Sequence, residues 1–478
     1  MIQQNNYFND LEKFLSSSFS SQLTIHINLT NMFQEIDAIG VSSLGSGLGK
    51  CTNLTNLTLN IKNKKIGDEG VLGLCQGLGN CSNLSKLALV LKNNKIGDQG
   101  VKGLGLFLEK CTNLSNLQLF LSNNQISSIG VVDLGFGLGK CINLSNLRLT
   151  LSDNQICSFG VSSLGSYLGK CSNLSNLELD LSENQIGATG ASDLGSGLGL
   201  CINLQNLALD LNENKISDKG ASVLGSGLGQ CINLQNLTLD LYLNNIGAIG
   251  ASGLGFGLGK CTNLSNLTLN LGYNQIGAIG AQDLVSGLGK CTGLSNLTLQ
   301  LQNNKIGAIS AGFGTALGEC TNLTNLTLDL RENQIDDYNN KIHSPKYNTL
   351  KDKFIDIFKK TCNNKNKQGV SVLGSGLGKC AHLSNLKLDL SSNQIGDKGI
   401  LGLASGLGKC TNLQNLILDL YKNQIGDIGA SGLVSSFGKC TKLLKLKLNL
   451  VKNQLNTSQY LEVKCLKSKR LVALKLFY

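Results

Sequence analysis

Cysteine is the residue of chemical interest that recurs most regularly in this sequence. Of 17 cysteines, thirteen occupy the same place in a repeat of about 30 residues. They are Cys51, Cys81, Cys111, Cys141, Cys171, Cys201, Cys231, Cys261, Cys291, Cys320, Cys380, Cys410 and Cys440. Each repeat offers one such Cys, the total is odd and no Cys-x-x-Cys occurs, which disfavours disulfides and metal sites without excluding them. We interpret the column as buried reduced thiols that pack as small hydrophobic side chains.

Other reactive residue types do not form a recognisable catalytic or cofactor site. His26, His343 and His382 are scattered. The segment Gly45–Lys50 has a glycine-rich sequence like a phosphate-binding loop, but its spacing differs and it follows a predicted helix instead of preceding one. The hydrolase, zinc-protease and protein-kinase motifs are also missing. We therefore expect no enzymatic activity, no cofactor and no bound metal.

Acidic residues and tyrosines are the candidate binding residues, because they recur at positions that the hydrophobic pattern leaves on the surface. Like charges at neighbouring strand positions repel each other, so stability does not explain a stacked row of Asp. The predicted partner-binding residues are Phe120, Glu178, Asp180, Asp210, Asp240, Tyr242, Tyr273, Asp329, Asp389, Asp419 and Tyr421. Acidic groups with aromatic anchors predict a basic protein partner, and a solvated surface without a partner is the simpler alternative.

The repeat that carries these residues combines two hydrophobic periods. In residues 171–200, Leu177, Leu179 and Leu181 alternate with acidic residues, which is the pattern of a half-buried strand. Leu194 and Leu198 lie four apart, as on one face of a short helix. Strands that are joined through helical crossovers pair in parallel. A single unit cannot bury its leucines, but a stack of units can.

The predicted fold class is therefore an α/β solenoid with a parallel sheet of about 14–15 strands and short outer helices. Fourteen strand patterns run from residues 25–29 to residues 443–450, and residues 471–476 form a partial fifteenth. Because helices are wider than strands, the stack should bend into a right-handed horseshoe with the sheet on its concave face.

The repeat resembles a known family. The pattern Leu-x-x-Leu-x-Leu, followed by Asn-x-Ile, Gly and Leu-x-x-x-Leu, is similar to the leucine-rich repeat of the ribonuclease-inhibitor type. The resemblance covers about residues 23–478 apart from one interruption. This chain has two more residues between the strand leucines and the Asn than the family pattern has, which predicts a longer strand or a bulge at that point.

We expect four segments along the chain. Residues 1–22 are predicted to be a capping helix, and residues 23–335 leucine-rich repeats. Residues 336–368 form a basic insert with eight Lys against four Asp, in which residues 350–360 have the spacing of an amphipathic helix. This insert is either a docking helix or a gene-model artefact, and a decayed repeat is the least favoured interpretation. Residues 369–478 are predicted to be further repeats and a C-terminal cap.

The net charge of +11 comes mainly from two segments and does not indicate a nucleic-acid-binding protein. Residues 439–478 hold ten Lys or Arg against one Glu, and the insert adds a net charge of +4, so the rest of the chain is slightly acidic. No apolar run approaches the length of a membrane span, and the first residues do not resemble a secretory signal. We expect a monomer in the cytoplasm or the nucleus.

The predicted function is a non-catalytic scaffold or adaptor that binds a protein partner through its concave face. The family resemblance implies two alternatives. One is a GTPase-activating or other signalling regulator, although the basic end of this chain differs from the acidic tail of such relatives. The other is the sensing arm of a kinase or nucleotide-binding signalling system.

Overall fold

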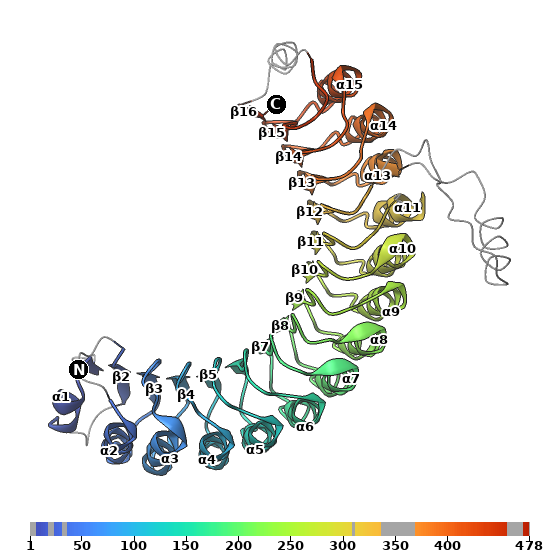
Figure 1. The fold of residues 1–478 in the computed structure, drawn as a ribbon. Helices are drawn as coiled ribbons and strands as arrows, with labels where there is room; N and C mark the ends of the chain where they lie inside the picture. The colour runs from blue at the N-terminus through green and yellow to red at the C-terminus, as the bar shows by residue number, and fades with distance from the viewer. Residues whose placement is uncertain are drawn as a thin grey trace, which may run out of the picture. The chain divides into compact units, whose positions relative to one another are not determined.

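The structure is a computed structural model that describes residues 6–17, 23–30, 36–307, 311–335, 369–456 and 472–477 (Figure 1). The contacts divide the chain into two compact units, and each is described by itself. The first unit contains Met1–Gln275 and Lys290–Gln300, and the second contains Ile276–Gly289 and Leu301–Tyr478. The predicted basic insert, residues 336–368, lies outside the described residues.

Strands and helices alternate in the first unit. Its strands are β1 (Asn6–Phe8), β2 (Thr24–Asn28), β3 (Asn56–Asn60), β4 (Lys86–Val90), β5 (Asn116–Phe120), β6 (Asn146–Thr150), β7 (Asn176–Asp180), β8 (Asn206–Asp210), β9 (Asn236–Asp240), β10 (Asn266–Asn270) and β11 (Asn296–Gln300). Its helices are α1 (Leu11–Leu15), α2 (Ala38–Leu48), α3 (Gly67–Leu78), α4 (Asp98–Leu108), α5 (Ser128–Leu138), α6 (Ser158–Leu168), α7 (Gly187–Leu198), α8 (Ser217–Leu228) and α9 (Ala248–Leu258).

The second unit follows the same plan. Its elements are α10 (Gly277–Leu288), α11 (Ala311–Glu319), β12 (Asn325–Asp329), α13 (Gly369–Leu377), β13 (Asn385–Asp389), α14 (Asp397–Leu407), β14 (Asn415–Asp419), α15 (Asp427–Phe437), β15 (Lys445–Asn449) and β16 (Ala473–Phe477). Strand β12 pairs directly with β13, so the register of the repeats continues across the insert.

All described strands pair in parallel with their sequence neighbours within each unit, as predicted from the helical crossovers. The register is strict, since Leu177 lies opposite Leu207 and Asp180 opposite Asp210. Figure 1 shows one layer of strands and one layer of helices, and the leucines between the layers are buried. The α/β solenoid is confirmed. Strands β2 to β15 are the fourteen predicted strands, and β16 is the predicted closing strand.

The N-terminal segment differs from the predicted capping helix. Residues 6–8 form strand β1, which pairs with β2, and the described helix α1 covers only Leu11–Leu15. The helix begins after Asp10, whose side chain accepts a hydrogen bond from the backbone N–H of Lys13. An extra strand satisfies backbone groups that the edge of β2 would otherwise expose, which a helix packed on the sheet end cannot do.

In most described repeats a buried or half-buried asparagine closes the turn between strand and helix, and Lys64 takes this position after β3. The Nδ2 group of Asn184 donates to the carbonyl oxygens of Leu151, Leu181 and Ser182 at 3.0–3.1 Å. Its Oδ1 accepts from the backbone N–H of Ile156 in the preceding repeat. The aligned Asn side chains therefore form a ladder that satisfies backbone groups that water cannot reach.

The two additional residues of each repeat extend the strand pairing. The N–H groups of Leu181 and Glu183 donate to the carbonyl oxygens of Asp210 and Asn212 at 2.9 and 3.0 Å. Pairing with the next repeat therefore continues beyond β7 into the turn, as in the predicted longer strand. The residue before the buried Asn adopts a left-handed conformation, with φ of 53° at Glu183.

The cysteine column is buried in the core, as predicted. The Sγ atom of Cys141 donates to the carbonyl oxygen of Leu108 at 3.4 Å, and Cys231 contacts Leu198 in the same way. Burial raises the pKa of both thiols to about 12. The thiolate is the reactive form, so these side chains are protected twice, by exclusion of reagents and by protonation.

Cys157 lies outside this column, immediately before α6, and is exposed. Its Sγ lies 2.9 Å from the Ser128 hydroxyl. That hydrogen bond is the main cause that lowers the pKa of Cys157, and hydrogen bonds from the backbone N–H groups of Phe159 and Gly160 lower it further. The start of a helix favours a negative charge.

We predict that Cys157 is alkylated much faster than the buried cysteine column. Treating the native protein with iodoacetamide at pH 8, followed by peptide mass spectrometry, should label Cys157 while Cys141 and Cys231 remain unmodified. Unfolding in guanidinium should make all three react and serves as the control. Equal labelling rates in the native protein would contradict the buried position of the column.

Glycines in the helices allow neighbouring repeats to approach closely. A Cβ atom on Gly77 in α3 would overlap the carbonyl group of Gly45 in α2. The same relation joins Gly227 to Gly195. The glycine-rich Gly45–Lys50 segment is therefore part of a close helix–helix contact, which explains its recurrence in structural terms.

We predict that Gly77→Ala destabilises the protein by about 1–3 kcal/mol, because the methyl group forces two backbones apart. Gly79→Ala is the matched control, since its Cβ would meet neighbours only at an ordinary 3.4 Å. Thermal unfolding followed by circular dichroism should show a lower midpoint for the first variant alone. Equal midpoints would show that the helices adjust without cost.

Candidate functional site

The outward face of the sheet presents three rows of side chains. In a five-residue strand the first, third and fifth side chains point away from the helices, as Asn176, Glu178 and Asp180 do in β7. We call the side chains at strand positions one, three and five the first row, the middle row and the third row. All eleven predicted binding residues belong to the middle row, the third row or the turns that follow the strands.

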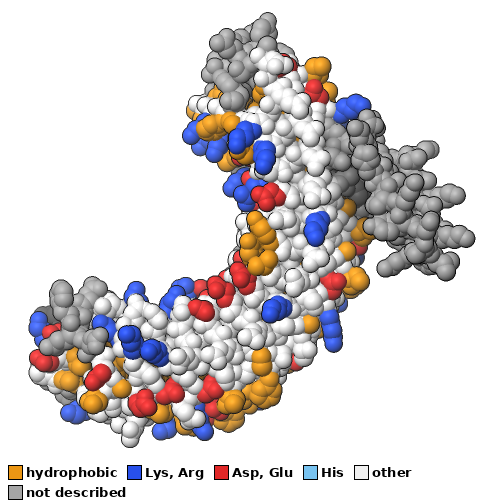
Figure 2. All heavy atoms as spheres, viewed as in Figure 1, with side chains coloured by type: hydrophobic (Ala, Val, Ile, Leu, Met, Phe, Trp, Pro, Cys, Tyr) orange, Lys and Arg blue, Asp and Glu red, His pale blue; other side chains and the backbone are white. Residues whose placement is uncertain are grey.

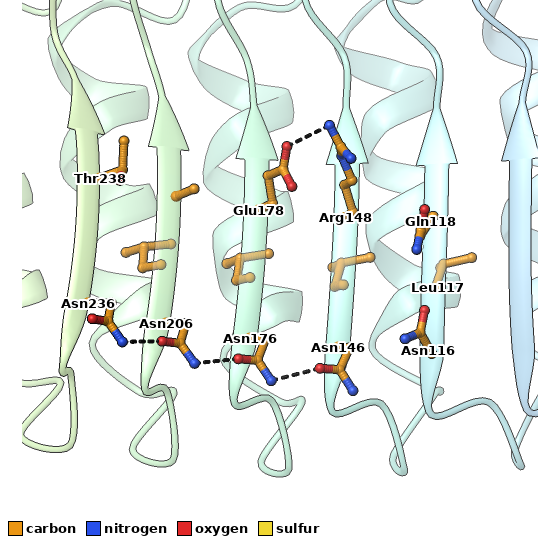
Figure 3. Close-up of a pocket in the computed structure, with 14 residues that line it drawn as sticks. Asn116, Leu117, Gln118, Asn146, Arg148, Asn176, Glu178, Asn206, Asn236 and Thr238 are labelled. Atoms are coloured by element: carbon orange, nitrogen blue, oxygen red, sulfur yellow. Dashed lines mark hydrogen bonds and ion pairs between the residues drawn. The ribbon is translucent and has the colours of Figure 1, made fainter. Parts of the chain in front are cut away.

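The first row is a ladder of side-chain amides (Figure 3). Each Nδ2 group donates to the Oδ1 of the preceding repeat, with distances of 2.5–2.7 Å. The ladder consists of Asn146, Asn176, Asn206, Asn236, Asn266 and Asn296. This second ladder was missed by sequence reasoning, although an Asn precedes the first leucine of most strands.

Arg148 in the middle row connects two of the predicted residues. Its Nη2 atom lies 2.9 Å from Oε1 of Glu178 (Figure 3), and its guanidinium lies 4.9 Å from the ring centre of Phe120. The charge of Glu178 is therefore balanced by a cation on the neighbouring strand. Arg148 was missed by sequence reasoning because the candidate residues were chosen as acidic or aromatic.

A shallow groove of about 430 Å³ follows these rows across β5 to β9. Its lining includes the amide ladder, Gln118, the Arg148–Glu178 pair and the small side chains of Ala208 and Thr238. The groove is open to solvent and exposes both polar and apolar groups.

The third-row aspartates have a structural role. The Asp180, Asp210 and Asp240 carboxylates each accept a hydrogen bond from the backbone N–H two residues later, at 2.9–3.1 Å. Such a bond holds the turn after the strand. The sequence analysis found no stability reason for the row of Asp, and these hydrogen bonds provide one, because the lengthened strand leads directly into a turn that needs an acceptor.

These three carboxylates nevertheless keep an unbalanced negative charge. Among the described residues, no Lys or Arg lies within ion-pair distance of Asp180, Asp210 or Asp240. Burial raises the pKa of Asp210, and the carboxylates of Asp240 and Asp180 raise it further, against the lowering effect of the Asn212 N–H. A nearby cation would relieve this repulsion.

Large side chains flank these aspartates in the turns after β9 and β10. The rings of Tyr242 and Tyr273 lie 5.1 Å apart, and Leu243 is 42% exposed beside them. Desolvation is the main cause that raises the pKa of Tyr242, and the neighbouring Tyr273, Glu213 and Asp240 raise this pKa further. Figure 2 shows acidic side chains beside a hydrophobic group along this part of the first unit. The acidic–tyrosine patch comprises Asp180, Glu183, Asp210, Glu213, Asp240, Tyr242, Leu243 and Tyr273.

The predicted residues of the second unit have different surroundings. Arg331 contacts Asp329 at 2.7 Å and Asp389 at 3.5 Å, and Asp329 is only 8% exposed. The two charges are thus shared with a cation that the sequence analysis did not consider. Asp419 accepts from the N–H of Tyr421 and from Asn449.

Tyr421 already has a cation–π contact, because the Nζ of Lys452 lies 5.3 Å from its ring centre. The structure therefore gathers Asp180, Asp210, Asp240, Tyr242 and Tyr273 within the first unit as an unbalanced acidic group with exposed rings. In the second unit Arg331 pairs with Asp329 and Asp389, whereas Asp419 has the same kinds of partner as Asp240, a backbone N–H and an Asn side chain.

Metal-binding and membrane-spanning features are absent from the part of the chain that the structure describes. No group of three or more His, Cys, Asp or Glu side chains there could hold a metal ion. No described helix is long and apolar enough to cross a membrane.

The repeats match the family model described as "Leucine Rich repeat". The matched segments are residues 85–105, 173–195, 206–225, 263–285, 382–404 and 410–434. Together with the parallel sheet and the 30-residue register, these matches show that the chain is a leucine-rich repeat protein.

Solved structures support the same fold. An internalin from Listeria monocytogenes is 20% identical, with a TM-score of 0.52 over 91% of this chain and 93% of that chain. A leucine-rich repeat protein from Leptospira interrogans is 18% identical, with a TM-score of 0.50 over 99% of this chain and 100% of that chain. No curated protein sequence matches the chain significantly. The comparisons do not distinguish the ribonuclease-inhibitor type from other leucine-rich repeats.

We predict that replacing Asp180, Asp210 and Asp240 together by Ala destabilises the first unit, whereas replacing them by Asn does not. Each Ala leaves a backbone N–H without its acceptor, at a cost of about 0.5–1.5 kcal/mol. Asn keeps an acceptor, as Asn270 shows by accepting from the N–H of Gly272 at 3.1 Å. Urea unfolding of the two triple variants measures the difference. Identical midpoints would show that the turn does not need these bonds.

Proposed function

We propose that this protein is a non-catalytic scaffold that binds a basic segment of a protein partner on the acidic–tyrosine patch. Leucine-rich repeat solenoids offer an extended surface whose outward side chains are not needed for the core, which suits protein binding. The patch combines charge for attraction with aromatic side chains for close contact.

The observation that carries the proposal is the conformation of Leu243 and Tyr273. Both have left-handed backbone angles, with φ of 52° and 55°, and both are substantially exposed. In the other described repeats this position holds Asn, Asp, Glu, Ser or Lys. Bulky residues are unfavourable there and bury little surface in return, so their presence supports a role outside folding.

The electrostatics of the patch favour a cationic ligand. A Lys or Arg side chain placed near Tyr242 and Tyr273 would meet two aromatic faces and the carboxylates of Asp240 and Glu213. It would also relieve the repulsion that raises the pKa of Asp210. Binding should therefore weaken with salt and when the pH falls far enough to protonate Asp210.

We predict that the triple variant Asp180→Asn, Asp210→Asn, Asp240→Asn folds normally and loses at least tenfold in affinity for a basic partner. The partner is obtained by affinity capture with the unmodified protein, and its dissociation constant is then measured by titration of purified components at two salt concentrations. The variant Glu69→Gln, Glu109→Gln, Asp133→Asn removes the same charge from the helix layer and should bind normally. Equal binding by both variants would refute the role of the third-row charge.

A second variant tests the apolar part of the patch. Leu243→Asn with Tyr273→Asn introduces the residue found at the equivalent Asn93 and Asn123, so thermal stability should stay constant or rise by about 1 kcal/mol. Binding should nevertheless weaken, because the exposed anchors are gone. Unchanged affinity would show that these side chains do not contact the partner.

A further inference from the structure

The outward face of the last strands has a composition unlike that of the first unit. The middle row of β13 to β16 reads Lys387, Ile417, Lys447 and Lys475, and these residues lie opposite one another in the sheet. The equivalent row of β8 to β11 holds only Ala208, Thr238, Thr268 and Thr298. Lys445 adds a further cation in the first row of β15, where most strands have Asn.

These four lysines are exposed. Within the described part of the second unit, no carboxylate lies within ion-pair distance of Lys387, Lys445, Lys447 or Lys475. The nearby third-row carboxylates of Asp389 and Asp419 already accept other hydrogen bonds. Since Lys447 lies directly opposite Lys475, the two like charges destabilise the sheet. An anionic ligand would remove this repulsion.

Apolar groups lie among the charges. Ile417 is 39% exposed between Lys387 and Lys447. The Nζ atoms of Lys447 and Lys475 lie 5.7 and 5.2 Å from the ring centre of Phe477. The surface therefore presents cations around an exposed aliphatic side chain on a rigid strand framework.

We propose that this lysine face, Lys387, Ile417, Lys445, Lys447 and Lys475, binds an acidic polypeptide segment that also carries apolar residues. Lys387 and Lys447 are two strands apart, about 10 Å, which three residues of an extended chain span. An acidic side chain at each end and an apolar one between them would match Lys387, Ile417 and Lys447. The surface is separate from the acidic–tyrosine patch, has the opposite charge and does not depend on the proposed function.

The composition favours a polypeptide over a nucleic acid or a membrane. The cations of the face are lysines without the guanidinium groups that bind phosphate through two hydrogen bonds. Among the described residues, the ring that contacts these lysines is Phe477, and because Lys447 and Lys475 both lie against it, it is not free to stack on a base. The exposed Ile417 at the centre instead suits an apolar side chain.

The test uses the full-length protein and a fluorescein-labelled 12-residue peptide in which Glu alternates with Leu and Ser. Fluorescence anisotropy should show binding that weakens with salt, and Lys447→Gln with Lys475→Gln should weaken it more than tenfold. The control variant Lys379→Gln with Lys409→Gln removes two exposed charges at the helix ends and should change affinity less than twofold. Equal effects of the two variants, or no binding at all, would overturn the proposal.

Two further measurements identify the class of ligand. A 20-nucleotide oligo-dT and vesicles of phosphatidylcholine with phosphatidylserine are titrated in the same way. Tighter binding of either one than of the peptide, lost with Lys447→Gln and Lys475→Gln, would overturn the polypeptide assignment. Ile417→Ser should weaken binding of the Glu/Leu/Ser peptide but not binding of polyglutamate. Equal effects on the two affinities would contradict the role of Ile417 in binding an apolar side chain. The Asp→Asn triple variant of the first unit should bind the peptide normally.

Discussion

The structure depends on the need to satisfy the backbone of a turn that is buried between neighbouring repeats. Asn184 meets this need with one side chain, donating to three carbonyl groups and accepting from one N–H. Two of these partners, Leu151 and Ile156, belong to the preceding repeat. A repeat of different length would therefore leave buried groups without partners, which keeps the register close to 30 residues.

The same register determines what the outward face can present. Because equivalent residues lie side by side, any residue type placed at one position becomes a row. Amides form a favourable row, since Asn176 donates to Asn146 and accepts from Asn206. Carboxylates form an unfavourable one, and it persists in the first unit partly because each Asp also holds its turn. Asp180, Asp210 and Asp240 thus hold their turns and also belong to the surface that we propose for binding.

The repeated parts of this protein could be predicted from sequence because periodicity reports them directly. The strand leucines and the thiol column each recur at one position, and the structure confirms that both are buried. Arg148 and Arg331 could not be assigned in the same way, since each occurs once and its effect depends on reach across strands. An alignment of the repeats places Arg148 between Gln118 and Glu178 on neighbouring strands. The ion pair of Arg148 with Glu178 could therefore have been predicted by comparing the strands one by one. The role of the aspartates required the turn geometry, which alternation of residue types does not reveal.

The residues most informative about binding are those that a purely structural repeat would not retain. Leu243 and Tyr273 occupy a backbone conformation that suits Asn, and Lys447 and Lys475 place like charges side by side. Both the backbone conformation of the bulky residues and the pair of like charges are unfavourable in the isolated protein. Substitution by the residue that neighbouring repeats have at the same position would remove either one. The net charge of +11 conceals these features, because an acidic patch in one unit and a lysine face in the other partly cancel. In a repeat protein, therefore, the local departure from the repeat is a better guide to a partner than overall composition.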